Sequence, residues 1–186
     1  MKKNKSYVLL SIICVLIVIS LLYISMKKEP KEVTYLHVDY PQYDHVEDVV
    51  NASDLAFTGK IVDVRYECMN VANEEENELT GYHGESSSMP YTIYTIQTDK
   101  VYKGEIKNNK IEVKRLGGES DEVNYVLDEY TPIEEGDTYL FLVVTYPSGY
   151  PSFVNATQGV YSLTQAQNNE TTSIKLNDVL NFFHDR

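Results

Sequence analysis

The residues of this chain best suited to recognising a ligand are its tyrosines. The sequence holds 16 tyrosines and no tryptophan in 186 residues, and 14 of the tyrosines follow residue 33. An aromatic ring can stack on a sugar or a peptide, although tyrosine also suits half-buried strands that bind nothing. Four tyrosines in or next to expected loops are therefore the candidate ligand-binding residues: Tyr82, Tyr130, Tyr146 and Tyr150.

Covalent chemistry has one candidate nucleophile, Cys68, with His83 as its base. The two residues flank a long polar segment, and no third residue is placed to orient the histidine. The chain also lacks a G-x-S-x-G elbow and a glycine-rich phosphate loop followed by lysine. We expect no catalytic residue and a non-enzymatic protein, with a Cys68-dependent hydrolase or redox protein as the alternative. A lone cysteine near a strand end is expected to be a small buried apolar residue.

Metal ligation and cofactor binding find little support in the sequence. The four histidines include no pair at helical ligand spacing, and one cysteine in the domain cannot build a structural zinc site. The acidic run at 74–78 offers oxygen ligands for calcium, yet no stretch has the residue order of an EF-hand loop. We expect solvated acids, no metal site and no cofactor.

Charge excludes one class of partner. Six of the 16 basic residues and two of the 28 acidic residues lie in the first 32 positions, which leaves 10 basic and 26 acidic residues and a net charge of −16 for residues 33–186. Nucleic acid binding needs clustered lysine and arginine, so we expect no nucleic acid partner. Cations, basic peptides or solubility alone are compatible with this charge.

An uncharged apolar run at residues 7–26 predicts one transmembrane helix, because 20 helical residues span roughly 30 Å, the thickness of a bilayer core. The run ends with bulky residues instead of a small-residue cleavage site, so it is expected to stay attached as a signal-anchor, with cleavage as the alternative. Residues 1–6 then form a cytoplasmic tail and 27–32 a juxtamembrane linker. The protein is predicted to be a single-pass protein of the cell membrane, with residues 33–186 as an extracytoplasmic domain.

The domain at residues 33–186 is predicted to be mainly β. An edge strand is expected over 33–38 and a short helix over 45–52, begun by a capping box that joins Asp44 to Glu47. The alternation of apolar residues over 55–67 changes phase, which predicts a bulge between Gly59 and Val62. Two long bent strands favour a small closed antiparallel barrel. The wholly apolar run 139–144 predicts a strand buried on both faces.

Three further segments complete the domain. Residues 68–90 are polar and aperiodic, which predicts a flexible acidic loop. Residues 153–156 and 159–163 are expected to pair as a final hairpin. Leu176, Val179, Leu180 and Phe183 share one helical face, so an amphipathic C-terminal helix is expected to close the core of the domain.

The segments 53–64, 94–95, 101–104, 117–118, 135–142 and 158–161 resemble a group of uncharacterised exported domains of Gram-positive bacteria. Their arrangement is also similar to the OB-like barrel of the tissue-inhibitor-of-metalloproteinase and netrin-like superfamily. The resemblance implies a small OB-like barrel and carries over no functional residue, because inhibitors of that superfamily use a free N-terminal cysteine and a disulfide framework that this chain lacks.

These observations together predict a membrane-anchored extracytoplasmic binding module. Its partners are expected to be the membrane, through residues 7–26, and a cell-surface protein, a peptide or a cell-wall glycan. An accessory or inhibitory subunit of another membrane protein is the alternative function.

Overall fold

The computed structural model describes residues 31–70, 88–120, 123–164 and 174–184. The chain divides into Met1–Lys31 and Glu32–Arg186, and the fold below is that of the second unit. In the described ranges, no helix is long and apolar enough to cross a membrane. The predicted tail, the predicted span at 7–26 and residues 27–30 of the linker lie outside those ranges.

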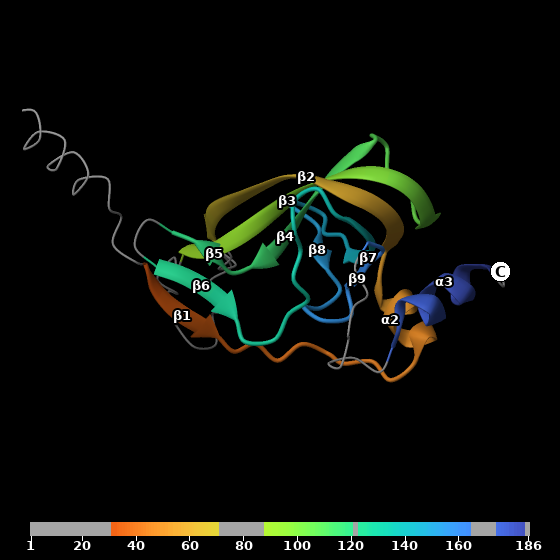
Figure 1. Ribbon diagram of the computed structural model, residues 1–186, viewed down its shortest axis with the longest axis horizontal. Coiled ribbons are helices and arrows are strands. Elements are labelled where there is room, and N and C mark those ends of the chain that lie inside the picture. The colour runs from red at the N-terminus through yellow and green to blue at the C-terminus, as the bar shows by residue number, and fades with distance from the viewer. Residues whose placement is uncertain (1–30, 71–87, 121–122, 165–173, 185–186) are drawn as a thin grey trace, which may run out of the picture. The chain divides into compact units, whose positions relative to one another are not determined.

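The domain is mainly β, with two helices. Figure 1 shows β2 and β3 as two long curved strands that run side by side. The elements in chain order are β1 (Glu32–Leu36), α2 (Val46–Ala52), β2 (Leu55–Asn70), β3 (Ser88–Lys103), β4 (Lys110–Leu116), β5 (Gly118–Glu119), β6 (Val123–Leu127), β7 (Thr138–Val144), β8 (Ser152–Phe153), β9 (Val160–Ser162) and α3 (Leu176–His184).

Five of these strands form a ring. The larger sheet has the order β2-β3-β4-β8-β7-β9, and β2 also pairs with β7, which closes β2, β3, β4, β8 and β7 on themselves. The pairing of β2 with β3 shifts register between Thr58 and Gly59 and again between Ile61 and Asp63, as the phase change predicted. The shifts bend β2, so its first half can pair with β3 on one edge and β7 on the other.

The ring closes through a narrow seam between β4 and β8. One residue pair, Lys114 with Ser152, joins these strands, and they run parallel. The Lys114 amide donates a hydrogen bond to the carbonyl of Pro151 at 2.8 Å. The prediction of a purely antiparallel sheet is therefore wrong at this seam, because the connection from β7 returns β8 alongside β4 in the same direction.

β7 separates two apolar cores, as its wholly apolar sequence predicted. Tyr139, Phe141 and Val143 point into the ring, whereas Leu140 and Leu142 face a second cluster that includes the helices. Alternate residues of a strand face opposite sides, so a strand covered on both sides needs no polar residue. The C-terminal helix α3 buries Val179 in the second cluster, which confirms its predicted role.

A separate small sheet has the order β1-β6-β5. β1 runs parallel to β6 over its whole length, from Glu32 opposite Val123 to Leu36 opposite Leu127. Beyond the strand ends, His37 Nδ1 lies 2.5 Å from a carboxylate oxygen of Asp128. This exposed ion pair holds the end of β1 beside the end of β6.

Two local predictions are wrong. β8 and β9 do not pair with each other, because β7 lies between them in the sheet and pairs with both. The N-cap of α2 is His45 instead of the predicted Asp44, and the His45 side chain makes no capping hydrogen bond. Glu47 and Asp48 in its first turn still complement the helix dipole.

The ladder of β2 and β3 reaches Asn70 opposite Ser88, so the strands extend into the segment that was predicted as a loop over 68–90. Residues 71–87 of that segment lie outside the described residues.

Candidate functional site

A groove of about 710 Å³ lies over the seam where β4 meets β8. Its size falls within the roughly 300–1,000 Å³ that is usual for small-molecule sites. The groove is built from the start of β3, the end of β4, and the connection from β7 to β8 together with β8 itself. Its lining residues are Tyr40, Met69, Tyr91, Lys114, Arg115, Leu116, Tyr146, Pro147, Ser148, Gly149, Tyr150, Ser152, Phe153 and Ala156. We call it the tyrosine groove.

Tyrosine rings surround the amine of Lys114 in this groove. Lys114 Nζ lies 4.9 Å from the ring centroid of Tyr146 and 5.5 Å from that of Tyr91, distances at which a cation is attracted by a ring face. The hydroxyl of Tyr146 is 2.7 Å from Ser152 Oγ, and this hydrogen bond joins the connection between β7 and β8 to β8 itself. Burial raises the pKa of Tyr91 and of Tyr40, and the neighbouring tyrosines add to both effects. The groove thus presents neutral hydroxyls and aromatic faces around one amine.

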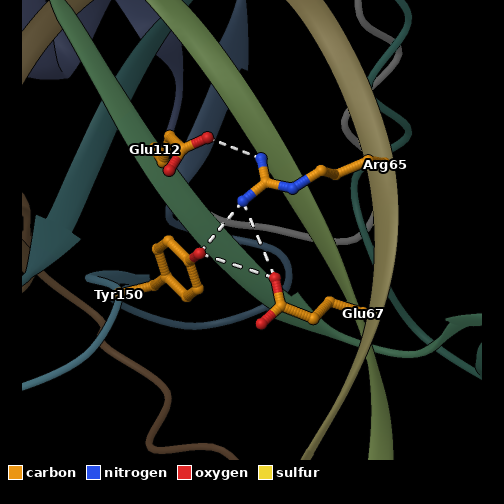
Figure 2. A network of polar contacts seen from close by, with 4 residues as sticks. All are labelled: Arg65, Glu67, Glu112 and Tyr150. Atoms are coloured by element: carbon orange, nitrogen blue, oxygen red, sulfur yellow. Dashed lines mark hydrogen bonds and ion pairs between the residues drawn. The ribbon is translucent and has the colours of Figure 1, made fainter.

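One wall of the groove is fixed by a polar network centred on Arg65 of β2 (Figure 2). Arg65 donates to Glu112 of β4 at 2.5 Å and to the Tyr150 hydroxyl at 3.0 Å. The Tyr150 hydroxyl donates in turn to Glu67 at 3.5 Å, and Glu67 lies 3.7 Å from the guanidinium. The hydrogen bond to Glu112 raises the pKa of Arg65 above its usual value, so the arginine is a constant cation. The network positions the Tyr150 ring, whose centroid is 5.6 Å from the guanidinium carbon.

A second, smaller cavity of about 340 Å³ lies between the ring and the small sheet. Arg115 lines this cavity, with the guanidinium carbon 5.1 Å from the ring centroid of Tyr94 and 4.7 Å from that of Tyr130. Arg115 also donates to the carbonyl of Thr131 at 2.9 Å. Burial raises the pKa of Tyr94 to about 12, although the nearby arginine opposes that change. Arg115 is held on three sides, so we assign it a structural role.

The structure separates the four tyrosines chosen from the sequence. Tyr146 and Tyr150 lie together in the tyrosine groove, whereas Tyr130 lines the second cavity. Tyr82 lies outside the described residues.

Sequence reasoning missed Tyr40, Tyr91 and Lys114 as groove residues. The alternation of β4 did place Lys114 on the outward face, with Val113 buried in the ring. No pattern in the sequence indicated that β8 would come alongside Lys114, and that contact creates the groove.

Cys68 is exposed, so the expectation that it would be a buried residue is wrong. Val64, Tyr66 and Cys68 share one face of β2, and this face leaves the core along the strand: Val64 packs against the ring core, whereas Tyr66 and Cys68 are exposed. His83, the candidate base for Cys68, lies outside the described residues. In the described ranges, no cluster of three or more metal-binding side chains occurs.

Comparison with known protein families and with curated proteins finds no match for this sequence. We therefore infer function from the geometry of the tyrosine groove.

Proposed function

We propose that this chain is a membrane-anchored, extracytoplasmic, non-enzymatic binding module that holds a cell-surface ligand in the tyrosine groove. The ligand is a protein, a peptide or a cell-wall glycan. The observation that carries the proposal is the gathering of four tyrosines, from three separate parts of the chain, around one hollow of ligand size. Aromatic faces with polar tips bind ligands that are partly apolar and partly hydrated.

The ring also supports the finer prediction of an OB-like barrel. A five-stranded barrel is typical of that fold, and the ring here has five strands. In OB-like barrels, oligosaccharides and oligonucleotides bind on the face of the second and third strands and at the loop between the fourth and fifth. The corresponding elements here are β3, β4 and the connection from β7 to β8, which together build the tyrosine groove. This support is an analogy between folds.

The anchor at 7–26 and the placement of the domain outside the cell are parts of the same proposal and rest on the apolar run. A domain tethered close to the membrane would meet wall material and membrane proteins at high local concentration.

Photo-crosslinking in intact cells tests the proposal. A benzophenone amino acid at Ser148, an exposed residue of the groove, should give a crosslinked product with wall or surface material. The control position is Lys107, an exposed residue of the connection between β3 and β4 that does not line the groove. No product from Ser148, or the same products from both positions, would contradict binding in the groove.

The exposed apolar side chains and the open edge of β1 favour a second candidate function, that of an accessory subunit of another membrane protein. Val33 and Tyr35 of this strand are 49% and 71% exposed, and in the described part of the chain β1 pairs along one edge only. An open strand edge with exposed apolar side chains can accept a strand of a partner. Affinity purification of the full-length chain should then recover a stoichiometric partner that is lost with Tyr35→Lys, whereas recovery without a partner would remove this candidate.

A further inference from the structure

The charge of the tyrosine groove is opposite to the charge of its domain. Residues 33–186 carry 26 acidic and 10 basic residues. The described residues that line the groove nevertheless include two basic side chains, Lys114 and Arg115, and no acidic one. A concave surface with this local charge favours an anionic group and disfavours a cationic one.

Lys114 is the cation of this groove that is available to a ligand. Its amine contacts the faces of Tyr91 and Tyr146 and makes no ion pair with a carboxylate of the described residues. Arg115 also lies over two rings, but it donates in addition to the carbonyl of Thr131. Arg65, behind the groove wall, is engaged by Glu112 and Glu67. An ammonium flanked by ring faces can accept a carboxylate or a phosphate while the rings hold the body of the same ligand.

The lining suits a sugar better than an extended peptide. Peptides that bind by strand addition need an open strand edge. At the groove floor β8 is paired on both edges, with β4 on one side and β7 on the other. The groove offers instead ring faces and hydroxyls, from its tyrosines and from Ser148 and Ser152. Those groups match the apolar face and the hydroxyl rim of a sugar ring.

We infer that the tyrosine groove takes an oligosaccharide with an acidic group, which Lys114 binds through its ammonium while Tyr146 and Tyr91 hold the adjoining sugar ring. This inference rests on the proposed function and specifies the ligand of that site. A carboxylate and a phosphate on the sugar would satisfy Lys114 by the same chemistry.

Calorimetric titration of the full-length chain in a mild non-ionic detergent tests the inference. The probes are a galacturonate tetramer, its neutral methyl ester, maltotetraose phosphate and neutral maltotetraose. We expect at least one acidic sugar to bind about tenfold or more tightly than its neutral counterpart, as a charge-assisted hydrogen bond does. Binding of the galacturonate tetramer alone identifies the acidic group as a carboxylate, and binding of the maltotetraose phosphate alone identifies it as a phosphate.

Variants of β4 supply the controls. Lys114→Met should weaken binding of the acidic sugar about tenfold or more, and Lys114→Arg should largely restore it. Lys110→Met is the matched control, because Lys110 is exposed on the same strand and face but does not line the groove, and it should bind as the wild type does. A thermal melt of each variant checks that the fold is retained.

Several results would overturn the inference: equal binding of acidic and neutral sugars, unchanged affinity in Lys114→Met, no saturable binding of either acidic sugar, or equally tight binding of a tetraglutamate peptide. Failure of the proposed function is a different result, because it would abolish the Ser148 crosslink itself. A Ser148 crosslink together with equal binding of acidic and neutral sugars would keep the groove as a binding site and remove only its acidic ligand.

Discussion

Substitution of Gly59 tests how the ring is closed, because β2 pairs at this residue with two strands at once. It lies opposite Thr98 of β3 and opposite Tyr139 of β7. A Cβ atom at this position would lie 2.7 Å from the carbonyl oxygen of Gln97 and 2.7 Å from a methyl carbon of Ile96. Carbon contacts are normally about 3.5–4.0 Å, so Gly59→Ala requires a shift of about 1 Å in a backbone that is held on both sides.

The expected cost follows from this geometry. Overpacking of a well-packed site costs about 1–3 kcal/mol, and the upper part of that range applies because one neighbour is backbone. Replacing glycine by alanine also restricts the unfolded chain, which returns about 0.4–1 kcal/mol. The net loss is about 2 kcal/mol, and it should lower the melting temperature by roughly 4–8 °C in a domain of this size.

Thermal unfolding followed by circular dichroism is the assay, with Lys60→Ala as the control. Lys60 is the next residue of β2, is exposed, and should change stability by less than about 0.5 kcal/mol. A melting temperature for Gly59→Ala that equals the wild-type value would refute the close approach of β2 to β3 at this point.

Three other perturbations have defined outcomes. The hydrogen bond between His37 and Asp128 raises the pKa of His37 above 6.5 and lowers the pKa of Asp128 below 3.8. The stabilisation from His37 is therefore complete below pH 6.5 and is lost as the pH rises through the raised pKa. The stabilisation from Asp128 is lost as the pH falls through the lowered pKa. An NMR titration should show this raised pKa for His37 and its return toward 6.5 in Asp128→Asn. Tyr161→Phe should stabilise the domain by about 1 kcal/mol, because the buried hydroxyl of Tyr161 has no hydrogen-bond partner in the described residues; a lower melting temperature would contradict this. Phe141→Ala should cost about 3–5 kcal/mol in urea unfolding, since the ring is fully buried among other aromatic rings, and a loss under 1 kcal/mol would contradict its place in the core.

The strands of this domain were predictable where one physical signal dominates. The wholly apolar run of β7 predicted burial on both faces, and the phase change in β2 located the bend near Gly59. The stripe on α3 likewise predicted which face would be buried. In each case the pattern lies within a single segment, so no knowledge of its neighbours was required.

The groove was not predictable, because it depends on contacts between distant segments. β8 has two residues, too few to show a period, and its position between β4 and β7 is set by tertiary packing. The final hairpin was predicted from proximity in the sequence, yet β7 lies between the two segments and pairs with both. Lys114 looked like an ordinary solvated lysine until β8 and its preceding loop brought Tyr146 against it.

Thiol labelling of a single cysteine in the groove tests the central claim most directly. The two cysteines of the sequence are first removed as Cys14→Ser and Cys68→Ser. In this background, Ser148→Cys would be treated with a membrane-impermeant maleimide in intact cells and as purified protein, with Lys107→Cys as the control. We predict that both cysteines react in intact cells, and that Ser148→Cys alone reacts more slowly there than in the purified protein because a ligand covers the groove. Reaction only after lysis would contradict an extracytoplasmic domain, and equal slowing at both positions would contradict a ligand in the tyrosine groove.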